Sequence, residues 1–120
     1  MSTHSPVFQR LWRQGDVLIA ECGPLPPGCL PFQGRVIAQG EAAGHAHRLT
    51  GPRASASLLH PPLRRVRPWN RAEFCLQVTG PKCVISHPEH RPIPLEPGCY
   101  MIWRQREFDP RSGASRTAGD

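Results

Sequence analysis

The stretch EFCLQVTGPKCVISH, residues 73–87, places two runs of alternating apolar and polar residues on either side of a Gly-Pro pair. A period of two is typical of half-buried β-strands, and Gly80 and Pro81 are turn residues. The stretch therefore predicts a hairpin in which Thr79 faces Lys82. This register gathers the apolar side chains and one histidine on a common core face: Phe74, Leu76, Val78, Cys83, Ile85 and His87.

Short β-like runs of the same kind recur along the chain, separated by many of its 15 prolines and 11 glycines. No long apolar stripe with helical spacing interrupts them. The runs lie at residues 16–22, 34–40, 56–60, 73–78, 82–87 and 99–108. The segment from His90 to Gly98 adds a further strand and a Pro-Gly turn before the last run. The sequence therefore predicts an all-β fold, either a small barrel or a sandwich.

The length of 120 residues is enough for one domain with one modest core. We expect an N-terminal arm at residues 1–13, a single β domain at 14–108 and a flexible tail at 109–120, where apolar residues are scarce. No apolar run approaches the ~20 residues of a membrane span, and the N-terminus lacks an apolar signal segment. Five cysteines without a C-x-x-C pair are typical of reduced thiols. These features predict a soluble, cytoplasmic protein without membrane contact.

Histidines are concentrated in two places, GEAAGHAHRL at residues 40–49 and ISHPEHRPI at residues 85–93. Residues i and i+2 of a strand point to the same side, so His45 and His47 can face one ion. His87 faces the core in the hairpin register, and His90 follows three residues later. Imidazole nitrogens bind Zn, Fe, Mn or Ni at about 2.0 to 2.2 Å.

We therefore expect one divalent transition metal, held by His45, His47, His87 and His90, if the two groups converge. An open coordination position would allow the metal to activate water or dioxygen, whereas four histidine ligands would make a closed, structural site. The pattern does not decide between an enzyme and a structural site. The plainer alternative is that each histidine is a partly buried hydrogen-bonding residue.

The H-x-H pair ahead of later strands resembles the first motif of cupins, G-x5-H-x-H-x3,4-E-x6-G, a family of metal-binding barrels. Here four residues, not five, separate Gly40 from His45, and no Glu lies at residues 50–52. Met101 occupies the place where the second cupin motif would have a histidine. The cupin resemblance is an analogy of fold, which implies a metal-binding β-barrel.

A closer resemblance is to small uncharacterised proteins of bacterial and phage genomes. They share G-D-V-L, G-E-x-x-G-H-x-H-R-L, H-x-E-H-x-x-I-x-L-x-x-G-x-Y and Q-R-E-[FY]. In this chain the four motifs lie at residues 15–18, 40–49, 87–100 and 105–108. They span nearly the whole body of the chain, so the resemblance implies one coherent domain and points to no particular reaction.

The positive charge of the chain suggests a second class of function. The net charge is +6, and arginines surround a tryptophan in one Pro-rich stretch: Arg64, Arg65, Arg67, Trp69 and Arg71. Arginine beside an aromatic ring suits phosphate contact combined with base stacking. The alternative function is thus a non-catalytic adaptor or nucleic-acid-associated module, and the plainer reading is a solvated loop. The sequence leaves open whether the protein binds a protein partner or forms a homo-oligomer.

Phosphate-loop, hydrolase and dinucleotide-binding motifs are absent from the sequence.

Overall fold

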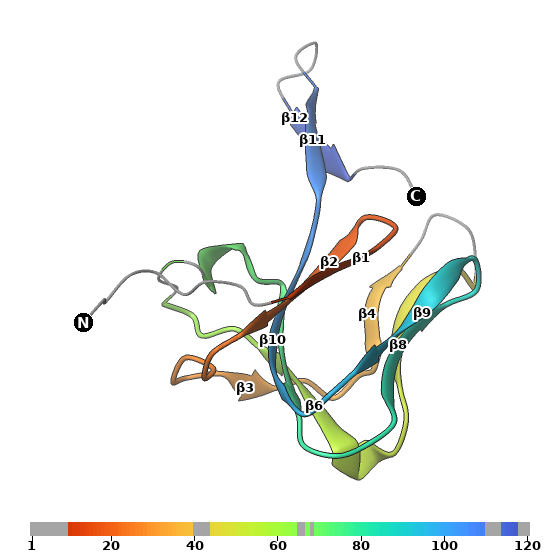
Figure 1. Cartoon of the computed structure of the whole chain (residues 1–120). Helices are drawn as coiled ribbons and strands as arrows, with labels where there is room; N and C mark the ends of the chain where they lie inside the picture. Colours follow the sequence, from red (N-terminus) through yellow and green to blue (C-terminus); the bar gives the residue numbers. More distant parts are fainter. Residues whose placement is uncertain (1–9, 40–43, 65–66, 68, 110–113, 118–120) are drawn as a thin grey trace.

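The computed structural model describes residues 10–39, 44–64, 67, 69–109 and 114–117 (Figure 1). Within these residues the regular structure consists of β-strands and two three-residue 3₁₀ turns, η1 (Arg53–Ser55) and η2 (Trp69–Arg71). The all-β prediction is confirmed, and each predicted β-like run contains an observed strand. No helix of the described residues is long and apolar enough to span a membrane.

The first sheet has six antiparallel strands in the order β1-β2-β10-β7-β6-β3. In that order the strands are β1 (Leu11–Gln14), β2 (Val17–Cys22), β10 (Gly98–Arg104), β7 (Phe74–Val78), β6 (Ala56–His60) and β3 (Leu30–Pro31). Strand β1 begins inside the expected N-terminal arm. It pairs with β2 through a tight turn in which Gly15 has a φ of 60°, a value that glycine adopts without steric cost.

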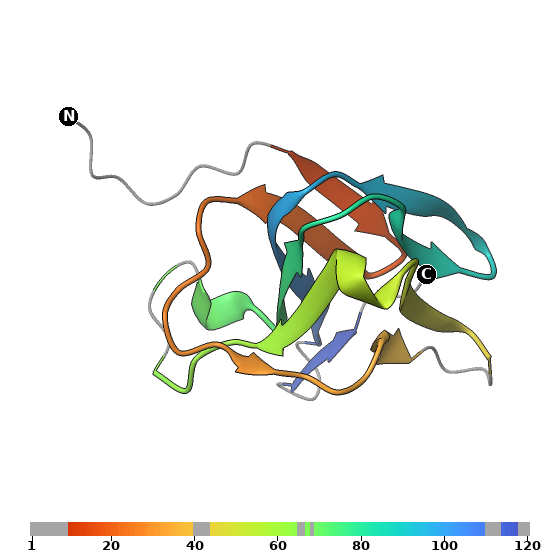
Figure 2. The ribbon, with the colours of Figure 1, turned by 90° about the horizontal axis from the view of Figure 1, so that it is seen from below.

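The second sheet has four antiparallel strands in the order β4-β5-β8-β9. They are β4 (Val36–Gln39), β5 (Ala46–Thr50), β8 (Cys83–His87) and β9 (His90–Leu95). The chain crosses from the first sheet to the second between β3 and β4, along the lower edge of the view in Figure 2. A separate hairpin of β11 (Arg106–Asp109) and β12 (Ala114–Thr117) follows β10, so part of the expected tail is a strand.

The two sheets pack face to face as a sandwich around the larger of two buried hydrophobic clusters. Ile19, Leu76 and Tyr100 of the first sheet belong to the same buried cluster as Leu49 and Ile85 of the second. Burial of such apolar surface contributes about 25 cal/mol per Å² to folding. A smaller buried cluster consists of Trp69, Ala72, Cys75 and Met101, which brings together η2, β7 and β10. Both faces of β7 and β10 are therefore covered, which explains why neither strand alternates cleanly between buried and exposed residues.

The predicted hairpin of residues 73–87 is wrong in its pairing. Strand β7 pairs with β10 and β6, whereas β8 pairs with β5 and β9 in the other sheet. The residues between β7 and β8 carry the chain across the sandwich, and Lys82 takes a φ of 66° there. Amides of Thr79 and Gly80 donate to the carbonyl of Ser55, at 2.7 and 3.1 Å, and so tie this crossing to η1.

The core face predicted for β8 is nevertheless confirmed. Cys83, Ile85 and His87 are buried, while Val84 and Ser86 are partly exposed. Alternation depends on the pleat of the strand itself, so it is the same whichever neighbour the strand pairs with.

Candidate functional site: a buried histidine cluster

Strand pairing brings the two histidine groups together. Strand β5 pairs with β8 so that Arg48 lies opposite Ser86, and the adjoining residues His47 and His87 have their rings in contact. A two-residue turn then joins β8 to β9 and sets His87 opposite His90. Three neighbouring strands thus each contribute one histidine at the same end of the second sheet.

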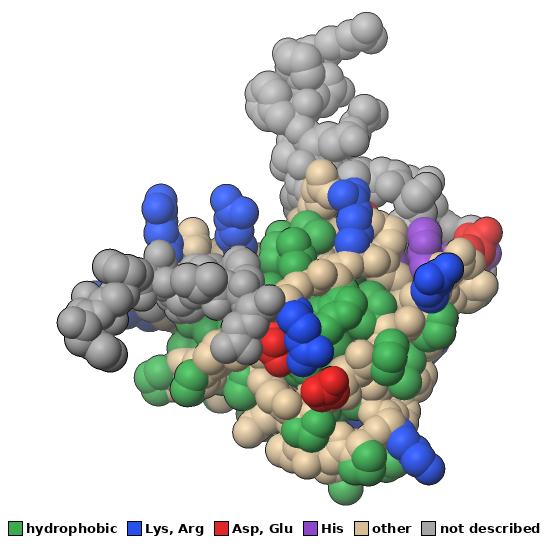
Figure 3. Space-filling view, in the orientation of Figure 1, with side chains coloured by type: hydrophobic (Ala, Val, Ile, Leu, Met, Phe, Trp, Pro, Cys, Tyr) green, Lys and Arg blue, Asp and Glu red, His purple; other side chains and the backbone are tan. Residues whose placement is uncertain are grey.

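The imidazole rings are in close contact. Ring centroids lie 4.5 Å apart for His47 and His87, and 4.5 Å apart for His87 and His90. The centroid of His45 lies 6.0 Å from that of His87, and those of His47 and His90 are 6.1 Å apart. We call these four residues the histidine cluster. Figure 3 shows histidine surface beside acidic surface at the end of the molecule where β8 and β9 turn.

Gln14, at the end of β1, fixes the proton position on His47. The Gln14 side-chain nitrogen donates to the carbonyls of Ile85 and Arg91, both at 3.0 Å. Its oxygen Oε1 is therefore an acceptor, and it lies 2.8 Å from Nδ1 of His47. His47 must then donate from Nδ1, so in the neutral ring Nε2 carries the lone pair.

A buried carboxylate lies on the Nε2 side of the same ring. Asp16 is 6 % exposed, and its Oδ1 is 3.7 Å from Nε2 of His47, whose side chain is 2 % exposed. Neither Gln14 nor Asp16 was among the site residues predicted from the sequence. Asp16 belongs to the G-D-V-L motif, and a carboxylate directly before a buried strand is the one signal that could have identified it.

The other side of the cluster is more open. The backbone amide of Glu89 donates to Nδ1 of His87 at 3.0 Å, so the neutral His87 ring carries its proton on Nε2. His45 Nδ1 lies 2.7 Å from Oε1 of Glu89, and these side chains are 38 % and 62 % exposed. The cluster therefore runs from a buried end at His47 and Asp16 to a solvent-facing end at His45 and Glu89.

The imidazole rings of the histidine cluster pack against one another and do not surround a common centre. The rings of His47 and His87 are tilted by 40°, and those of His87 and His90 by 51°. Across the part of the chain that the structure describes, no three His, Cys, Asp or Glu side chains are arranged to hold a metal ion. The right types of donor are thus gathered in one place, but their nitrogens are not aimed at a common point.

The arginine-rich loop presents only part of the surface that was expected from its sequence. Arg64, Arg67 and Arg71 are exposed, whereas Trp69 is 6 % exposed and belongs to the smaller buried cluster. A ring buried in this way has no face available for stacking on a base. Arg65 lies outside the described residues.

These features define a small two-sheet β protein with a histidine cluster at one end of its second sheet. The model of a family described as "Domain of unknown function (DUF8820)" matches residues 13–105. The chain therefore belongs to this family, and the resemblance to an uncharacterised family is confirmed. No curated protein and no solved structure matches the chain.

Proposed function

We propose that the protein binds one divalent transition metal at the histidine cluster, with Nε2 of His47 as the first ligand. The observation that carries this proposal is the hydrogen bond from Nδ1 of His47 to Gln14. A metal-binding histidine commonly donates its second ring N–H to a fixed acceptor, which sets the tautomer and aims the lone pair of the other nitrogen. Gln14 is such an acceptor, since two backbone carbonyls hold its amide.

Asp16 supports the same proposal as a second ligand. Asp16 is 6 % exposed, and its Oδ1 is 3.7 Å from Nε2 of His47, so a carboxylate oxygen and the imidazole nitrogen that carries the lone pair already lie close together. A metal ion bound between them would gain one oxygen and one nitrogen ligand. Nitrogen and carboxylate donors together suit Zn, Fe, Mn or Ni.

The remaining ligands would come from His87 and His90, with His45 at the open end. The ring of His87 packs 4.5 Å from its neighbours, and its Nδ1 accepts the Glu89 amide. Coordination by His87 therefore requires its ring to turn and exchange that hydrogen bond for a bond to the metal. The proposed ligands are several histidines and a carboxylate on a β scaffold, and in this respect the site is similar to that of cupins.

Metal analysis of untagged protein tests the proposal. Protein would be incubated in turn with Zn²⁺, Mn²⁺, Ni²⁺ and anaerobic Fe²⁺, dialysed, and assayed for bound metal. We expect about one equivalent of at least one metal in the parent, and loss of it in His47→Ala and in Asp16→Asn. The Asp16→Asn variant keeps the size of the side chain, so it separates loss of a ligand from loss of folding.

His60→Ala is the matched control, because His60 is exposed on β6 and lies outside the cluster. It should retain the full equivalent. Circular dichroism and thermal unfolding establish that each variant is folded. Failure of the parent to retain any of the four metals, or equal retention by folded His47→Ala and Asp16→Asn, would refute the proposal.

We further propose that the protein acts in the cytoplasm. All five cysteines are among the described residues and no disulfide joins them. Cys22 and Cys99 lie directly opposite each other on β2 and β10, an arrangement in which an oxidising compartment would favour a cross-strand disulfide. Thiol counting on protein extracted under alkylating conditions tests this: five alkylated cysteines support it, and three contradict it.

A further inference from the structure

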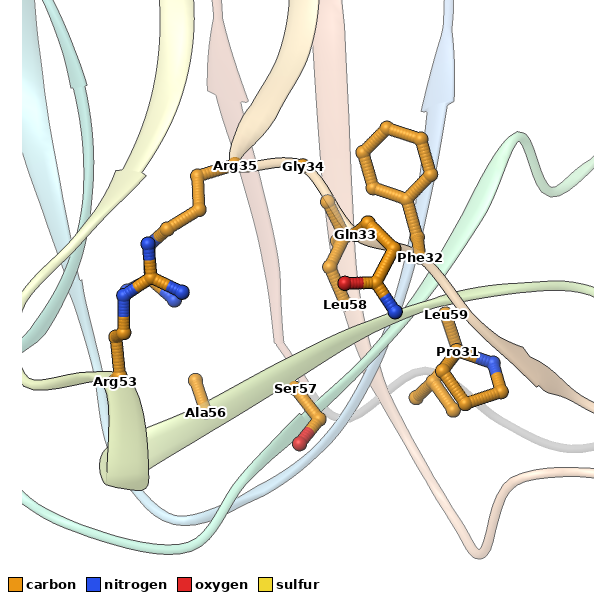
Figure 4. Close-up of a pocket in the computed structure, with 10 residues that line it drawn as sticks. All are labelled: Pro31, Phe32, Gln33, Gly34, Arg35, Arg53, Ala56, Ser57, Leu58 and Leu59. Carbon is orange, nitrogen blue, oxygen red and sulfur yellow. The ribbon is translucent and has the colours of Figure 1, made fainter.

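A pocket of about 270 Å³ lies where the chain crosses between the two sheets. One wall is the segment that joins β3 to β4, and the opposite wall is η1 and β6 (Figure 4). It shares no residue with the histidine cluster. Its volume is slightly below the range of roughly 300 to 1,000 Å³ that is typical of small-molecule sites, so only a small ligand would fit.

Two arginines, Arg35 and Arg53, line one end of the pocket. The side chains of Arg35 and Arg53 point toward one another in Figure 4, and none of the residues that line the pocket is acidic. Among the described residues, neither arginine forms an ion pair with a carboxylate. Two positively charged side chains that line one pocket, with no acidic residue beside them, favour an anionic ligand there.

Arg35 is held in place before any ligand binds. Its Nε donates to the carbonyl of Leu49 at 3.1 Å, and its Nη2 donates to the carbonyl of Gly51 at 3.3 Å. These bonds leave donors on Nη1 for a ligand, and their fixed geometry reduces the entropy lost on binding. A planar guanidinium of this kind matches the oxygens of a phosphate or carboxylate.

The other end of the pocket is apolar and aromatic. Phe32 and Leu58 line it, and the ring of Phe32 also packs against Phe74 with a centroid distance of 4.9 Å. Gly34 is required for this arrangement, since a Cβ at that position would lie 2.7 Å from the Phe32 ring. Ser57 and Gln33 add polar groups between the two ends.

We propose that this pocket binds a small organic anion. Its phosphate or carboxylate group lies between Arg35 and Arg53, and its apolar or planar body lies against Phe32. The separation of charge at one end from an aromatic wall at the other selects a ligand that has both parts. A simple inorganic anion satisfies only the arginines and binds more weakly.

Isothermal titration with phenyl phosphate, inorganic phosphate and phenol tests the proposal. We expect saturable binding of phenyl phosphate, at least about tenfold weaker binding of inorganic phosphate, and no binding of phenol. Arg53→Gln should weaken phenyl phosphate at least about tenfold, since a guanidinium–phosphate contact is a charge-assisted hydrogen bond. Arg53 is exposed, so this variant should fold normally. Arg64→Gln, an exposed arginine outside the pocket, should bind like the parent.

Gly34→Ala separates the two ends of the pocket. The added methyl must displace the Phe32 ring, so the variant should lose affinity for phenyl phosphate while its weak binding of inorganic phosphate is unchanged. The proposal is overturned if phenyl phosphate does not saturate the parent, or if folded Arg53→Gln binds it as tightly. Competition against phenyl phosphate by a single-stranded oligonucleotide whose own binding requires Arg53 would show that the pocket binds nucleic acid instead of a small anion. That result would also overturn the proposal.

Discussion

Nδ1 of His47 lies 2.8 Å from Oε1 of Gln14, and this contact links the two sheets of the sandwich. Gln14 comes from β1 at the edge of the first sheet, whereas His47 comes from β5 in the second. The same glutamine donates to the carbonyls of Ile85 and Arg91 on β8 and β9. One side chain, 2 % exposed, thus has all three of its hydrogen bonds directed at the opposite sheet.

Replacement of Gln14 by Ala should therefore destabilise the protein strongly. It removes the three hydrogen bonds that Gln14 forms with the carbonyls of Ile85 and Arg91 and with Nδ1 of His47. At roughly 1 kcal/mol for each lost bond, the free energy of unfolding should fall by about 2 to 4 kcal/mol. Urea denaturation measures the change. Gln77→Ala is the control, because Gln77 is exposed on β7 and should change stability by less than about 0.5 kcal/mol. Equal stability of the two variants would contradict this account.

Gly51→Ala should be one of the most damaging single substitutions in the chain. Gly51 has a φ of 113°, and an added Cβ would lie 2.1 Å from the carbonyl oxygen of Lys82. Neither atom can move easily, because Gly51 follows β5 and Lys82 precedes β8, and these strands are paired. Backbone strain and overlap together should lower stability by more than about 2 kcal/mol, measured by thermal and urea unfolding.

Gly23→Ala is the matched control for this substitution. Gly23 follows β2, and a Cβ there would meet nothing within 4 Å. Its stability should be equal to or slightly above that of the parent, since alanine restricts the unfolded chain more than glycine does. Comparable loss in both variants would mean that contact with Lys82 is not the cause.

The sequence predicted the strands better than their partners, for a physical reason. Breakers such as Gly80 and Pro81 mark where a strand ends, but they do not tell whether the chain turns back or crosses to another sheet. The inward face of Ile85 and His87 was correct because alternation is local. Pairing was wrong because it depends on β10 and β5, whose partners are set by packing across the whole chain.

As with the strands, the sequence predicted part of the candidate site and missed the part that depends on contacts between the sheets. Spacing identified His45 and His47 as a pair that can share a face, and alternation placed His87 inside. Gln14 was not identifiable, because its role depends on β1 lying next to β9, a contact between opposite sheets. Trp69 was misjudged for the reverse reason: its arginine neighbours suggested solvent, whereas tertiary packing buries the ring.

Tyr100 should ionise only at high pH. It is the one tyrosine of the chain, so the ultraviolet absorbance of tyrosinate reports it alone. Burial, and secondarily the charge of Glu21, raises the pKa of Tyr100 from 10.0 to about 12. Between these values the unfolded chain loses the proton while the folded protein keeps it, so stability should fall as pH rises from 10.0 towards 12.

Tyr100→Phe provides the control for this titration. It abolishes the tyrosinate signal and removes the hydrogen bond that Tyr100 donates to the carbonyl of Glu96, at 2.5 Å. The ring contact with Trp12, at a centroid distance of 5.9 Å, should be retained, so the stability loss should be only about 0.5 to 1.5 kcal/mol. A tyrosinate transition near pH 10 in the folded parent would contradict the buried position of the hydroxyl.

The five cysteines should divide into two reactive and three protected thiols. Cys75 and Cys83 are 0 % and 1 % exposed, so a thiol reagent cannot reach them in the folded protein. Cys22 is partly exposed, but burial, with Cys99 as the next cause, raises its pKa from 9.0 to about 12. Its thiolate is therefore scarce at neutral pH, and the thiolate is the reactive form. Cys29 and Cys99, also partly exposed, should react first.

Iodoacetamide, with the modified cysteines counted by mass spectrometry, would measure these thiols without joining Cys22 to Cys99 as a disulfide reagent could. We expect two fast equivalents in the native protein and five after denaturation. Cys22→Ser should leave the fast count at two, whereas Cys99→Ser should lower it to one. A fast count of three that falls to two in Cys22→Ser would show that this thiol ionises readily. The packing between β2 and β10 would then be looser than the structure indicates, because burial is the largest cause of the raised pKa.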